Sequence, residues 1–506
     1  MKYVLTNEQM READLFTIET LGVPALELME RAGIALKEQA IKLAPTGKIL
    51  IVCGGGNNGG DGFVCGRHLL LAGRETDAVF FAEKRTHECA LNLSEFMMNN
   101  GRIYDSIPDG DYALVIDCLF GTGYTYREDE RTDAVIRKMN TLKKRGAKIL
   151  SGDIPSGVCG NSGVAKGEAV DADVTLCLGE IKSGVVLCDG LDHAGEVLRA
   201  DIGIMLPGFD ADGDGYARLV EEDEVKAFLP KRKRNTHKGN YGRATVVAGC
   251  EKYTGAAYLS ASAAVRSGAG YTTLLLPEKL FPVFALKIPE VLLSITNEGG
   301  RYAFNEEILA KIPKGAVAFG MGMDISEDVA LGAEYLLSHH EGALVLDADA
   351  LNSLAEYRKD TLASLFQNAT CEVVLTPHPR EFARLIGVPC SEVVEHALTL
   401  SQQYAKEWGC TILLKGAATV ITDGKRARIS CSGTAGQAKA GSGDVLSGVL
   451  AGLCASVDGG YETAVAAAYL CGRAAELATK DVGEYSLTAT DVIAYLGKAF
   501  LSLQTK

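Results

Sequence analysis

The chain has 506 residues, of which 47% are hydrophobic and 23% charged, and its 57 glycines indicate many tight turns. This composition excludes disordered and fibrous proteins and is typical of a globular α/β enzyme, while the length exceeds the roughly 150 residues of one domain. The formal charge of −14 excludes a general nucleic-acid-binding surface, because a phosphate backbone requires basic partners.

The sequence carries no sign of export or membrane insertion. Its apolar runs have the length of strands, and Met1–Tyr3 leads into polar sequence without a signal peptide. The 14 cysteines are spread singly with no Cys-x-x-Cys pair, which favours reduced core residues over disulfides or zinc. We therefore expect a cytoplasmic location, with neither membrane nor nucleic acid as a partner. The basic run Lys231–Arg234 is interpreted as a solvated turn, with a small nucleic-acid patch as the alternative.

Apolar runs alternate with helical stretches through the first half of the chain. The predicted strands are Ile49–Cys53, Ala78–Phe81, Leu114–Ile116, Lys148–Leu150 and Val174–Leu178. Their apolar residues are continuous rather than alternating, which indicates a mainly parallel sheet that helices cover on both faces.

Polar residues follow three of these strands. The turn Gly54–Gly62 follows the first strand, Asp117 the third and Asp153 the fourth. Ligands bind at this carboxyl edge of open parallel sheets, although either aspartate could instead cap a turn. The spacing Gly54-x-Gly56-x-x-Gly59 also matches the dinucleotide fingerprint of redox enzymes, but Asn57–Gly62 adds amides and a carboxylate that suit a hydroxylated or ionic ligand.

The residues between Pro207 and Asp223 are rich in Gly, Asp and Pro and predict a boundary between two domains, 1–215 and 216–506. Beyond it the strand pattern returns without a repeat of the sequence. The predicted strands are Ala244–Ala248, Thr272–Leu276, Val317–Phe319, Leu344–Leu346, Val373–Leu375 and Ile412–Leu414. We therefore predict an α/β protein of two doubly wound domains.

A second glycine turn, Ala440–Asp444, precedes a helix of small residues near the end of the chain. Such a turn aims backbone N–H groups and a helix N-terminus at an anion. Two anion-binding turns on two domains predict two active sites, both for phosphorylated molecules.

The first-half motifs together resemble the NAD(P)H-hydrate epimerase family, which inverts C6 of hydrated nicotinamide cofactors. They are Gly56–Gly62, Asp117 with Gly121–Gly123, and Asp153–Gly157. The resemblance implies a Rossmann-like three-layer sandwich and K⁺ bound by Asn58, Asp117 and Ser156, whose hard oxygens suit such an ion. It also implies that Asp153 contacts the reacting end of the substrate, and we predict that Asp153 is catalytic, because it is the best carboxylate for proton exchange at the hydrated ring. The substrate-binding residues that it implies are Asn57, Asn58, Gly59, Gly60, Asp61, Gly121, Thr122, Gly123, Tyr124, Thr125, Tyr126 and Arg127.

Four second-half runs resemble the nucleotide-dependent NAD(P)H-hydrate dehydratases of the ribokinase-like group. They are Asn235–Gly242, Leu346–Asn352, Thr376–Glu381 and Gly441–Asp444. The resemblance implies that Asp444 deprotonates the hydroxyl that accepts phosphate, and that ADP binds with Mg²⁺ on its phosphates. The nucleotide would lie along Lys415, Gly416, Ala417, Ala418, Thr419 and Gly443, and the hydrated cofactor would border Ala257, Gly322 and His378. A lone histidine such as His378 also commonly has a purely structural role.

By this resemblance we expect a bifunctional isomerase and lyase that epimerises NADHX and NADPHX and dehydrates the S epimer with ADP, giving AMP and phosphate. Thr434–Ala438 departs from the relatives' Asn-Pro-Gly-Met-Ala, and Ala440 replaces a common glycine, so the choice between ADP and ATP stays open. A cofactor-binding regulatory protein would lack the acidic residues Asp153 and Asp444, and a vitamin or sugar kinase fused to a redox domain would yield a stable phosphorylated product or transfer hydride. We also expect a homo-oligomer, whose size the sequence leaves open.

Overall fold

The computed structural model describes residues 2–208 and 215–504 of the chain. Its contacts divide the chain into two compact units, of which the first comprises Lys2–Ala217 and the second begins at Arg218. This border lies close to the one predicted after residue 215. The division itself says nothing about chemistry, so the assignment of one activity to each unit stays a prediction.

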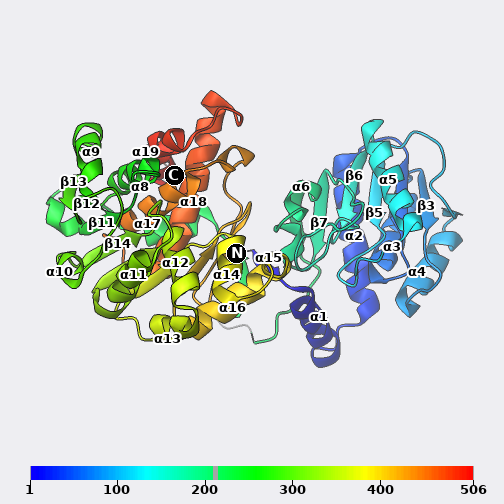
Figure 1. Cartoon of the computed structure of the whole chain (residues 1–506). Coiled ribbons are helices and arrows are strands. Elements are labelled where there is room, and N and C mark those ends of the chain that lie inside the picture. The colour runs from blue at the N-terminus through cyan, green and yellow to red at the C-terminus, as the bar shows by residue number, and fades with distance from the viewer. Residues whose placement is uncertain (1, 209–214, 505–506) are drawn as a thin grey trace. The chain divides into compact units, whose positions relative to one another are not determined.

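The first unit alternates strands with helices (Figure 1). Its strands are β1 (Tyr3–Leu5), β2 (Ile49–Cys53), β3 (Thr76–Phe80), β4 (Arg102–Tyr104), β5 (Leu114–Cys118), β6 (Lys148–Gly152), β7 (Val174–Leu178), β8 (Ile181–Lys182) and β9 (Glu196–Ala200). Its helices are α1 (Asn7–Leu15), which continues as a π-helix at Phe16–Thr20, α2 (Ala25–Leu43), α3 (Asn57–Leu71), α4 (His87–Met98), α5 (Glu130–Lys144) and α6 (Gly190–His193).

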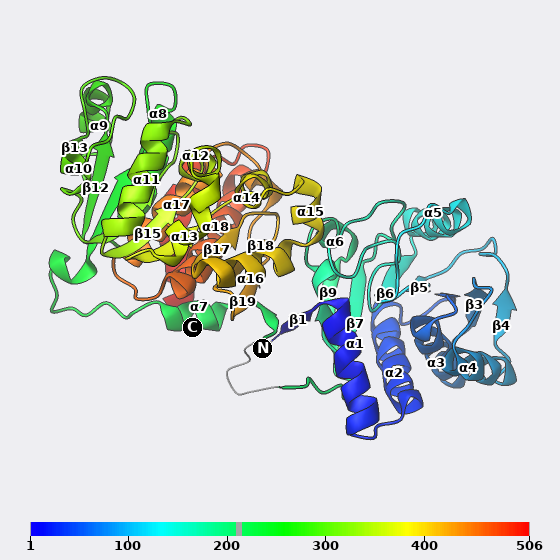
Figure 2. The ribbon, with the colours of Figure 1, turned by 60° about the horizontal axis from the view of Figure 1, so that its bottom comes forward.

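Strand β2 shows why the sheet is covered on both faces. Ile49, Ile51 and Cys53 pack into the core cluster that contains residues of α2, α3 and α4. Leu50 and Val52 pack into a second cluster with residues of α5. A strand that is apolar at every position requires this arrangement. Figure 2 shows α2, α3 and α4 on one side of the strands and α5 on the other, a three-layer sandwich as predicted.

The sheet of the first unit has the order β4-β3-β2-β5-β6-β7-β9 with parallel pairing throughout, and β1 pairs in parallel with β8. The chain runs outward from β2 through β3 to β4 and then returns to β5 on the other side of β2. The connections that follow β2 and β5 therefore diverge and leave a crevice at the carboxyl edge, where doubly wound proteins bind ligands.

Four strands of this unit were not predicted from the sequence. β1 and β8 have three and two residues, which is too short for a recognisable apolar run. β4 and β9 contain exposed and half-buried residues because they lie at the two edges of the sheet.

The second unit contains more strands than its sequence pattern predicted. They are β10 (Ala217–Leu219), β11 (Arg243–Val247), β12 (Tyr271–Leu276), β13 (Leu292–Ile295), β14 (Gly315–Phe319), β15 (Gly342–Leu346), β16 (Glu372–Leu375), β17 (Thr411–Leu414), β18 (Thr419–Thr422) and β19 (Ala427–Ser430).

Helices cover both faces of this second sheet. They are α7 (Glu222–Phe228), α8 (Thr254–Arg266), α9 (Phe281–Lys287), α10 (Glu306–Leu309), α11 (Glu327–His339), α12 (Asp349–Tyr357), α13 (Leu362–Gln367), α14 (Pro379–Ile386), α15 (Cys390–Glu395), α16 (Ala397–Trp408), α17 (Ser442–Cys454), α18 (Gly460–Val482) and α19 (Ala489–Gln504). Among all helices of the described residues, none is both long and apolar enough to cross a membrane.

The second sheet runs β13-β12-β11-β14-β15-β16-β17 in parallel and ends with β18 and β19 in antiparallel pairing, beside which β10 lies. Its order reverses between β11 and β14. Helices α8, α17 and α18 contact one face of this sheet (Figure 1). Helix α11 contacts β15, and helix α16 contacts β17 and β18. The predicted doubly wound fold is confirmed. The antiparallel hairpin was not predicted, because its half-polar strands resemble a loop in sequence.

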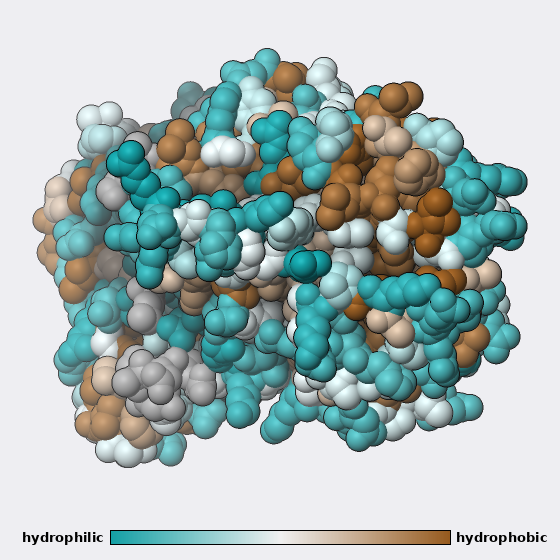
Figure 3. All heavy atoms as spheres, turned by 90° about the vertical axis from the view of Figure 1, so that its left-hand side faces the viewer, coloured by the Kyte–Doolittle hydropathy of each residue, from teal (hydrophilic) through white to brown (hydrophobic). Residues whose placement is uncertain are grey.

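One edge of the second unit exposes apolar side chains. Leu286 on α9 is 89% exposed, and Leu292 and Ile295 on the edge strand β13 are also exposed. Figure 3 views the molecule from this side and shows apolar side chains gathered among polar ones. Edge strands carry unpaired backbone groups, so this edge is suited to contact with another chain.

Candidate functional sites

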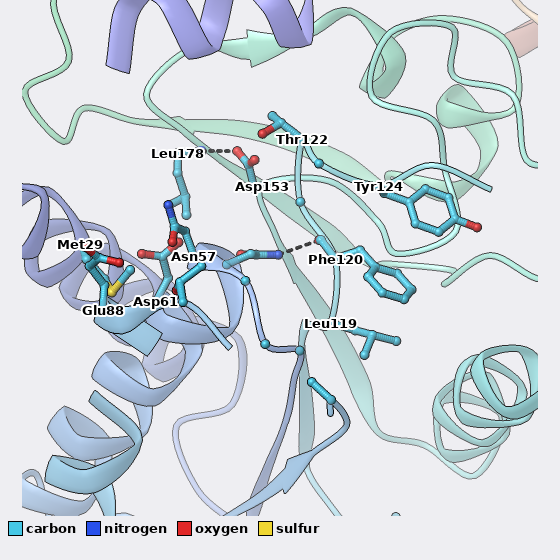
Figure 4. A pocket seen from close by; sticks show the side chains of 18 of the residues that line it. Met29, Asn57, Asp61, Glu88, Leu119, Phe120, Thr122, Tyr124, Asp153 and Leu178 are labelled. Atoms are coloured by element: carbon cyan, nitrogen blue, oxygen red, sulfur yellow. Dashed lines mark hydrogen bonds between the residues drawn. The ribbon is translucent and has the colours of Figure 1, made fainter. Parts of the chain in front are cut away.

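The first candidate site is the crevice between β2 and β5. It forms a cavity of about 1290 Å³, which exceeds the roughly 300–1,000 Å³ of most small-molecule pockets and has room for a dinucleotide. Figure 4 shows Asp61, Asp153 and Thr122 around the same space. Of the residues predicted to bind substrate, the cavity is lined by Asn57, Asn58, Asp61, Gly121, Thr122, Gly123, Tyr124, Thr125 and Arg127, together with Asp153.

The remaining predicted residues shape the site without lining it. A Cβ atom on Gly59 would lie 1.9 Å from the carbonyl oxygen of Gly54, and one on Gly60 would lie 2.6 Å from Sδ of Met29. Glycine at position 59 therefore allows the turn after β2 to close onto α3, and glycine at position 60 leaves room for the side chain of Met29 on α2. A Cβ on Gly167 would lie 2.8 Å from the ring of Tyr126, so Tyr126 packs against that loop instead.

Helix α3 begins at Asn57 with Gly56 as its N-cap, and neither residue caps it with a side chain. The first backbone N–H groups of the helix therefore remain available at the cavity. Together with the positive end of the helix dipole they suit an anionic group such as a pyrophosphate.

Asp117 lies fully buried at the end of β5. Its Oδ1 accepts hydrogen bonds from the backbone N–H of Leu119 at 3.2 Å and from Oγ of Ser156 at 2.6 Å. Its Oδ2 accepts from Oγ of Ser151 and from the N–H of Ser156, both at 2.9 Å. Burial raises the pKa of Asp117, while the hydrogen bonds from Ser156 and Leu119 oppose this rise.

Asn58 adds an unpaired oxygen above this carboxylate network. Its Nδ2 donates to the carbonyls of Phe120 at 2.6 Å and Gly152 at 3.0 Å, whereas its Oδ1 is buried without a hydrogen-bond partner. The N–H of Phe120 donates to Oγ of Ser156 at 3.0 Å and so links Asn58 with the pair Asp117 and Ser156. The structure thus brings together the three predicted K⁺ ligands, and buried orphan oxygens usually have an ion or water partner.

Asp153 is held in an unusual conformation beside the cavity. Its φ of +71° lies in the left-handed region, which is rare for residues other than glycine and is common at functional sites. Its Oδ1 accepts from the N–H of Leu178 at 3.2 Å and from the ammonium group of Lys182.

Lys182 was not predicted as a site residue. It is 1% exposed, it lines the cavity, and its Nζ also donates to the carbonyl of Leu178 at 2.6 Å. Burial lowers the pKa of Lys182, but the Asp153 carboxylate more than offsets this effect, so the pKa is raised and the ammonium persists. Its sequence context carries no clear signal, because Glu180 and Ser183 flank it as they would a surface lysine, and only its burial shows that it requires a charged partner.

The second candidate site lies where β15 and β17 end and α17 begins. The Nζ of Lys415 lies 2.7 Å from Oδ1 of Asp347 and 3.8 Å from Oε2 of Glu381. A Cβ on Gly443 would lie 3.4 Å from the same Nζ. Asp444 follows in the first turn of α17, so the glycine turn, its aspartate and this lysine meet at one point.

Burial raises the pKa of Asp444 to about 7, the negative charge of Asp347 adds to the rise, and Lys415 opposes it. A base with a pKa near the working pH is effective in proton transfer. Asp347 itself is fixed by a hydrogen bond from Oγ of Ser447 to its Oδ2 at 2.7 Å.

His378 has a structural role in this conformation. Its Nδ1 accepts from the N–H groups of Arg380 at 3.1 Å and Glu381 at 3.2 Å, while Glu381 accepts from the N–H of His378 at 2.8 Å. This reciprocal arrangement caps α14. Burial, followed by the nearby Lys415, lowers the pKa of His378, which favours a neutral ring. Its contact with a ligand stays a prediction.

Other predicted residues of the second unit lie along the same carboxyl edge. Ala257 on α8 is buried beside the turn after β11, because a Cβ on Gly249 of that turn would lie 2.7 Å from the Cβ of Ala257. Gly322 follows β14 with a φ of +61°, and the N–H of Gly249 donates to the carbonyl of Met321 at 2.8 Å. Both residues therefore lie where the strand order reverses. Gly416, Ala417 and Ala418 form the turn from β17 to Thr419 of β18.

The run Asn235–Gly242 lies at the opposite edge, before the amino end of β11. Gly242 has a φ of +63°, and a Cβ on it would lie 1.7 Å from the carbonyl oxygen of Ala455. Nearby, Arg232 stacks on Tyr241 at 4.0 Å and is exposed. This motif therefore supports the fold at a distance from Asp444 rather than forming part of the site around it.

The departure at Thr434–Ala438 has a structural counterpart. Oγ1 of Thr434 accepts from the N–H of Gly436 at 3.1 Å, and the side chain of Gln437 accepts from the N–H of Thr434 at 3.2 Å. Oγ of Ser442 then donates to the carbonyl of Gln437 at 2.7 Å. Thr434 and Gln437 thus cap this turn and join it to the start of α17.

Comparison with known proteins separates the same two halves. Residues 25–184 match the family described as YjeF-related protein N-terminus, and residues 244–498 match the family described as NAD(P)H-hydrate dehydratase. The second unit also resembles the crystal structure of an ADP/ATP-dependent NAD(P)H-hydrate dehydratase from Bacillus subtilis that was co-crystallised with ATP/Mg²⁺. The TM-score is 0.50 at 29% identity, over 56% of this chain and 98% of that one.

Relatives that combine both halves cover nearly the whole chain. The bifunctional NAD(P)H-hydrate repair enzyme Nnr of Moorella thermoacetica is 32% identical over 528 aligned residues, which span 99% of this chain and 97% of the relative. The enzyme of the same name from Archaeoglobus fulgidus is 33% identical over 486, which span 96% of each. With this similarity over both units, the chain belongs to the family of bifunctional NAD(P)H-hydrate repair enzymes.

Proposed function

We propose that the two activities of this repair enzyme are divided between its units. Residues 1–215 would interconvert R- and S-NAD(P)HX, and residues 216–506 would dehydrate the S epimer with ADP to give NAD(P)H, AMP and phosphate. The observation that carries the proposal is Asp444, a carboxyl with a pKa of about 7 beside Lys415 at the start of α17.

In the second unit Asp444 would take the proton of the ring hydroxyl as that oxygen attacks the terminal phosphate of the nucleotide. The backbone N–H groups at Gly443 and the start of α17 are suited to the transferring phosphoryl group. Asp347 and Glu381 are paired with Lys415, so a divalent cation such as Mg²⁺ would be held mainly by the phosphates, with few protein ligands. Such a cation neutralises charge on the phosphates.

In the first unit the N-terminus of α3 would hold the pyrophosphate of the substrate, and Asp153 would face its hydrated ring. The orphan Oδ1 of Asn58 fits K⁺ together with Asp117 and Ser156, because all three offer hard oxygens. Such an ion would fix the loops after β5 and β6.

The decisive experiment is incubation of mixed NADHX epimers with the protein, ADP and Mg²⁺, with the absorbance of restored NADH as the readout. Parallel reactions contain ATP, no nucleotide, or Asp444→Ala. We expect recovery with ADP, slower recovery with ATP and none without nucleotide. A stable phosphorylated product without NADH would support an ordinary kinase instead. Equal rates with ATP would show that the turn capped by Thr434 and Gln437 accompanies a different donor preference.

The homo-oligomer expected from the sequence stays part of the proposal. The exposed apolar residues of α9 and β13 support it, and light scattering of the purified protein measures the number of chains.

A further inference from the structure

Helix α1 contributes a carboxyl group to the first cavity that the proposed function does not use. Arg11, Asp14 and the π-helical residue Ile18 all line the cavity, and their spacing places them on one face of the helix. Asp14 is half-buried there, whereas its neighbours Glu12 and Leu15 are exposed. The motifs that carry the resemblance to the epimerase family begin at Gly56, after this helix, and the family match covers residues 25–184.

The charges that face Asp14 come from three other elements. Burial raises its pKa to about 6, Lys182 of β8 opposes the rise, and Asp153 from the loop after β6 adds to it. Asp61 of α3 is buried, and burial together with Asp153 raises its pKa well above the usual range. Arg11, on the same helix as Asp14, borders the cavity as well.

The Lys182 ion pair separates the roles of the two carboxyl groups. Asp153 accepts hydrogen bonds from the buried ammonium of Lys182 and from the N–H of Leu178. Asp14 has neither partner among the hydrogen bonds of the described residues. Two carboxyl groups in different surroundings commonly divide the work of an active site, one as the proton donor and the other as the group that stabilises the developing positive charge.

We propose that Asp14 is the proton donor of the epimerase and that Lys182 is a positioning residue, which holds the side chain of Asp153 beside the reacting ring. This inference rests on the proposed epimerase function of the first unit.

The chemistry balances without a redox partner. Asp14 gives its proton to the hydroxyl oxygen on C6, the C6–O bond breaks, and the lone pair of the ring nitrogen forms a double bond to C6 as water leaves. Asp153 stabilises the resulting cation. Water then adds to the opposite face of C6, and the nitrogen recovers its lone pair. The surplus proton of the added water passes through solvent in the cavity to the carboxylate of Asp14, which is thereby restored to its acid form.

The test uses the full chain with Asp14→Asn, and Glu12→Gln as the matched control on an exposed position of the same helix. Epimerisation of purified S-NADHX is followed by chromatography without nucleotide, and the uncatalysed rate at each pH is subtracted. We expect Asp14→Asn to lower kcat by roughly 100-fold or more, the usual contribution of a general acid, while KM changes little. Glu12→Gln should behave as the wild type, and dehydration of S-NADHX should continue in both variants.

The pH profile distinguishes an acid from a structural residue. Because the donor must be protonated, kcat of the wild type should fall as the pH rises through about 6, and Asp14→Asn should lose this limb. Asp14→Glu, which keeps a carboxyl, should retain the limb at a reduced rate. Lys182→Met should also alter the profile, since Asp153 loses its partner.

Near-normal kcat with an unchanged profile in Asp14→Asn would overturn the inference and leave the epimerase assignment intact. A wild-type protein without epimerase activity would overturn the proposed function itself.

Discussion

Replacing Asp444 with asparagine should stop dehydration and, at neutral or alkaline pH, make the second unit more stable. The side chain keeps its shape but can no longer ionise. In the folded protein the pKa of Asp444 is about 7, against a usual value of 3.8. The folded state therefore binds this proton more tightly than the unfolded chain, so the wild type has its full stability below about pH 4 and loses part of it as the pH rises to about 7.

The size of the effect follows from the pKa. A rise of about 3 units at about 1.36 kcal/mol per unit gives an upper bound of about 4 kcal/mol. Lys415 and Asp347 can rearrange around the charge, so we expect about 2 kcal/mol. The free energy of unfolding of Asp444→Asn should thus match that of the wild type at about pH 4 and exceed it by about 2 kcal/mol at pH 8, and kcat for dehydration should fall by roughly 100-fold or more.

Calorimetry of the full chain at both pH values measures this difference, and the transition of the first unit serves as the internal reference. Epimerase activity should remain as a check that the variant is folded. A stability difference that does not grow with pH, or a variant that is less stable at pH 8, would refute the assignment of a raised pKa to Asp444. The stability gained with the loss of activity would be the usual trade-off at a functional carboxyl.

Three further predictions concern the first site and the support of the fold. Asp153→Ala should recover only the S fraction of mixed NADHX rapidly, because the R epimer then depends on the slow spontaneous reaction; complete rapid recovery in an ADP-driven assay would contradict this role. Exchange of K⁺ for Na⁺ should raise the KM for epimerisation in the wild type, and Asp117→Asn should remove that dependence, which epimerisation assays in the two salts measure. Gly242→Ala should destabilise the second unit by about 2 kcal/mol or more, because the new Cβ would lie 1.7 Å from a carbonyl oxygen at a residue whose φ is +63°. Chemical denaturation measures this loss, and an unchanged unfolding midpoint would exclude the clash.

Much of the architecture was predictable because buried parallel strands leave a strong pattern. β2 and β7 were predicted to the residue, since every position of both is buried and the run ends at a glycine. β4 and β9 lie at sheet edges and were missed, because a half-exposed strand has the composition of a loop. The hairpin of β18 and β19 was missed for another reason, because its strands are largely buried but carry polar residues such as Thr419 and Arg428, so they show no continuous apolar run.

Short sequence motifs predicted where the two candidate sites lie. The turns at Gly54–Gly62 and Gly441–Asp444 and the aspartates after strands predicted which sheet edges matter, because the chain direction of a parallel strand fixes where its following loop lies.

Contacts between distant parts of the sequence were decided only by the tertiary structure. Lys182 meets Asp153 across 29 residues, and Lys415 meets Asp347 across 68, so no local pattern reveals either ion pair. The charge state of a carboxyl depends on its burial and on such partners, which explains why Asp14 and Asp444 have raised pKa values that the sequence does not show. The sequence by itself determined the fold and the two sheet edges where the candidate sites lie, and packing decided which of their acidic groups have raised pKa values.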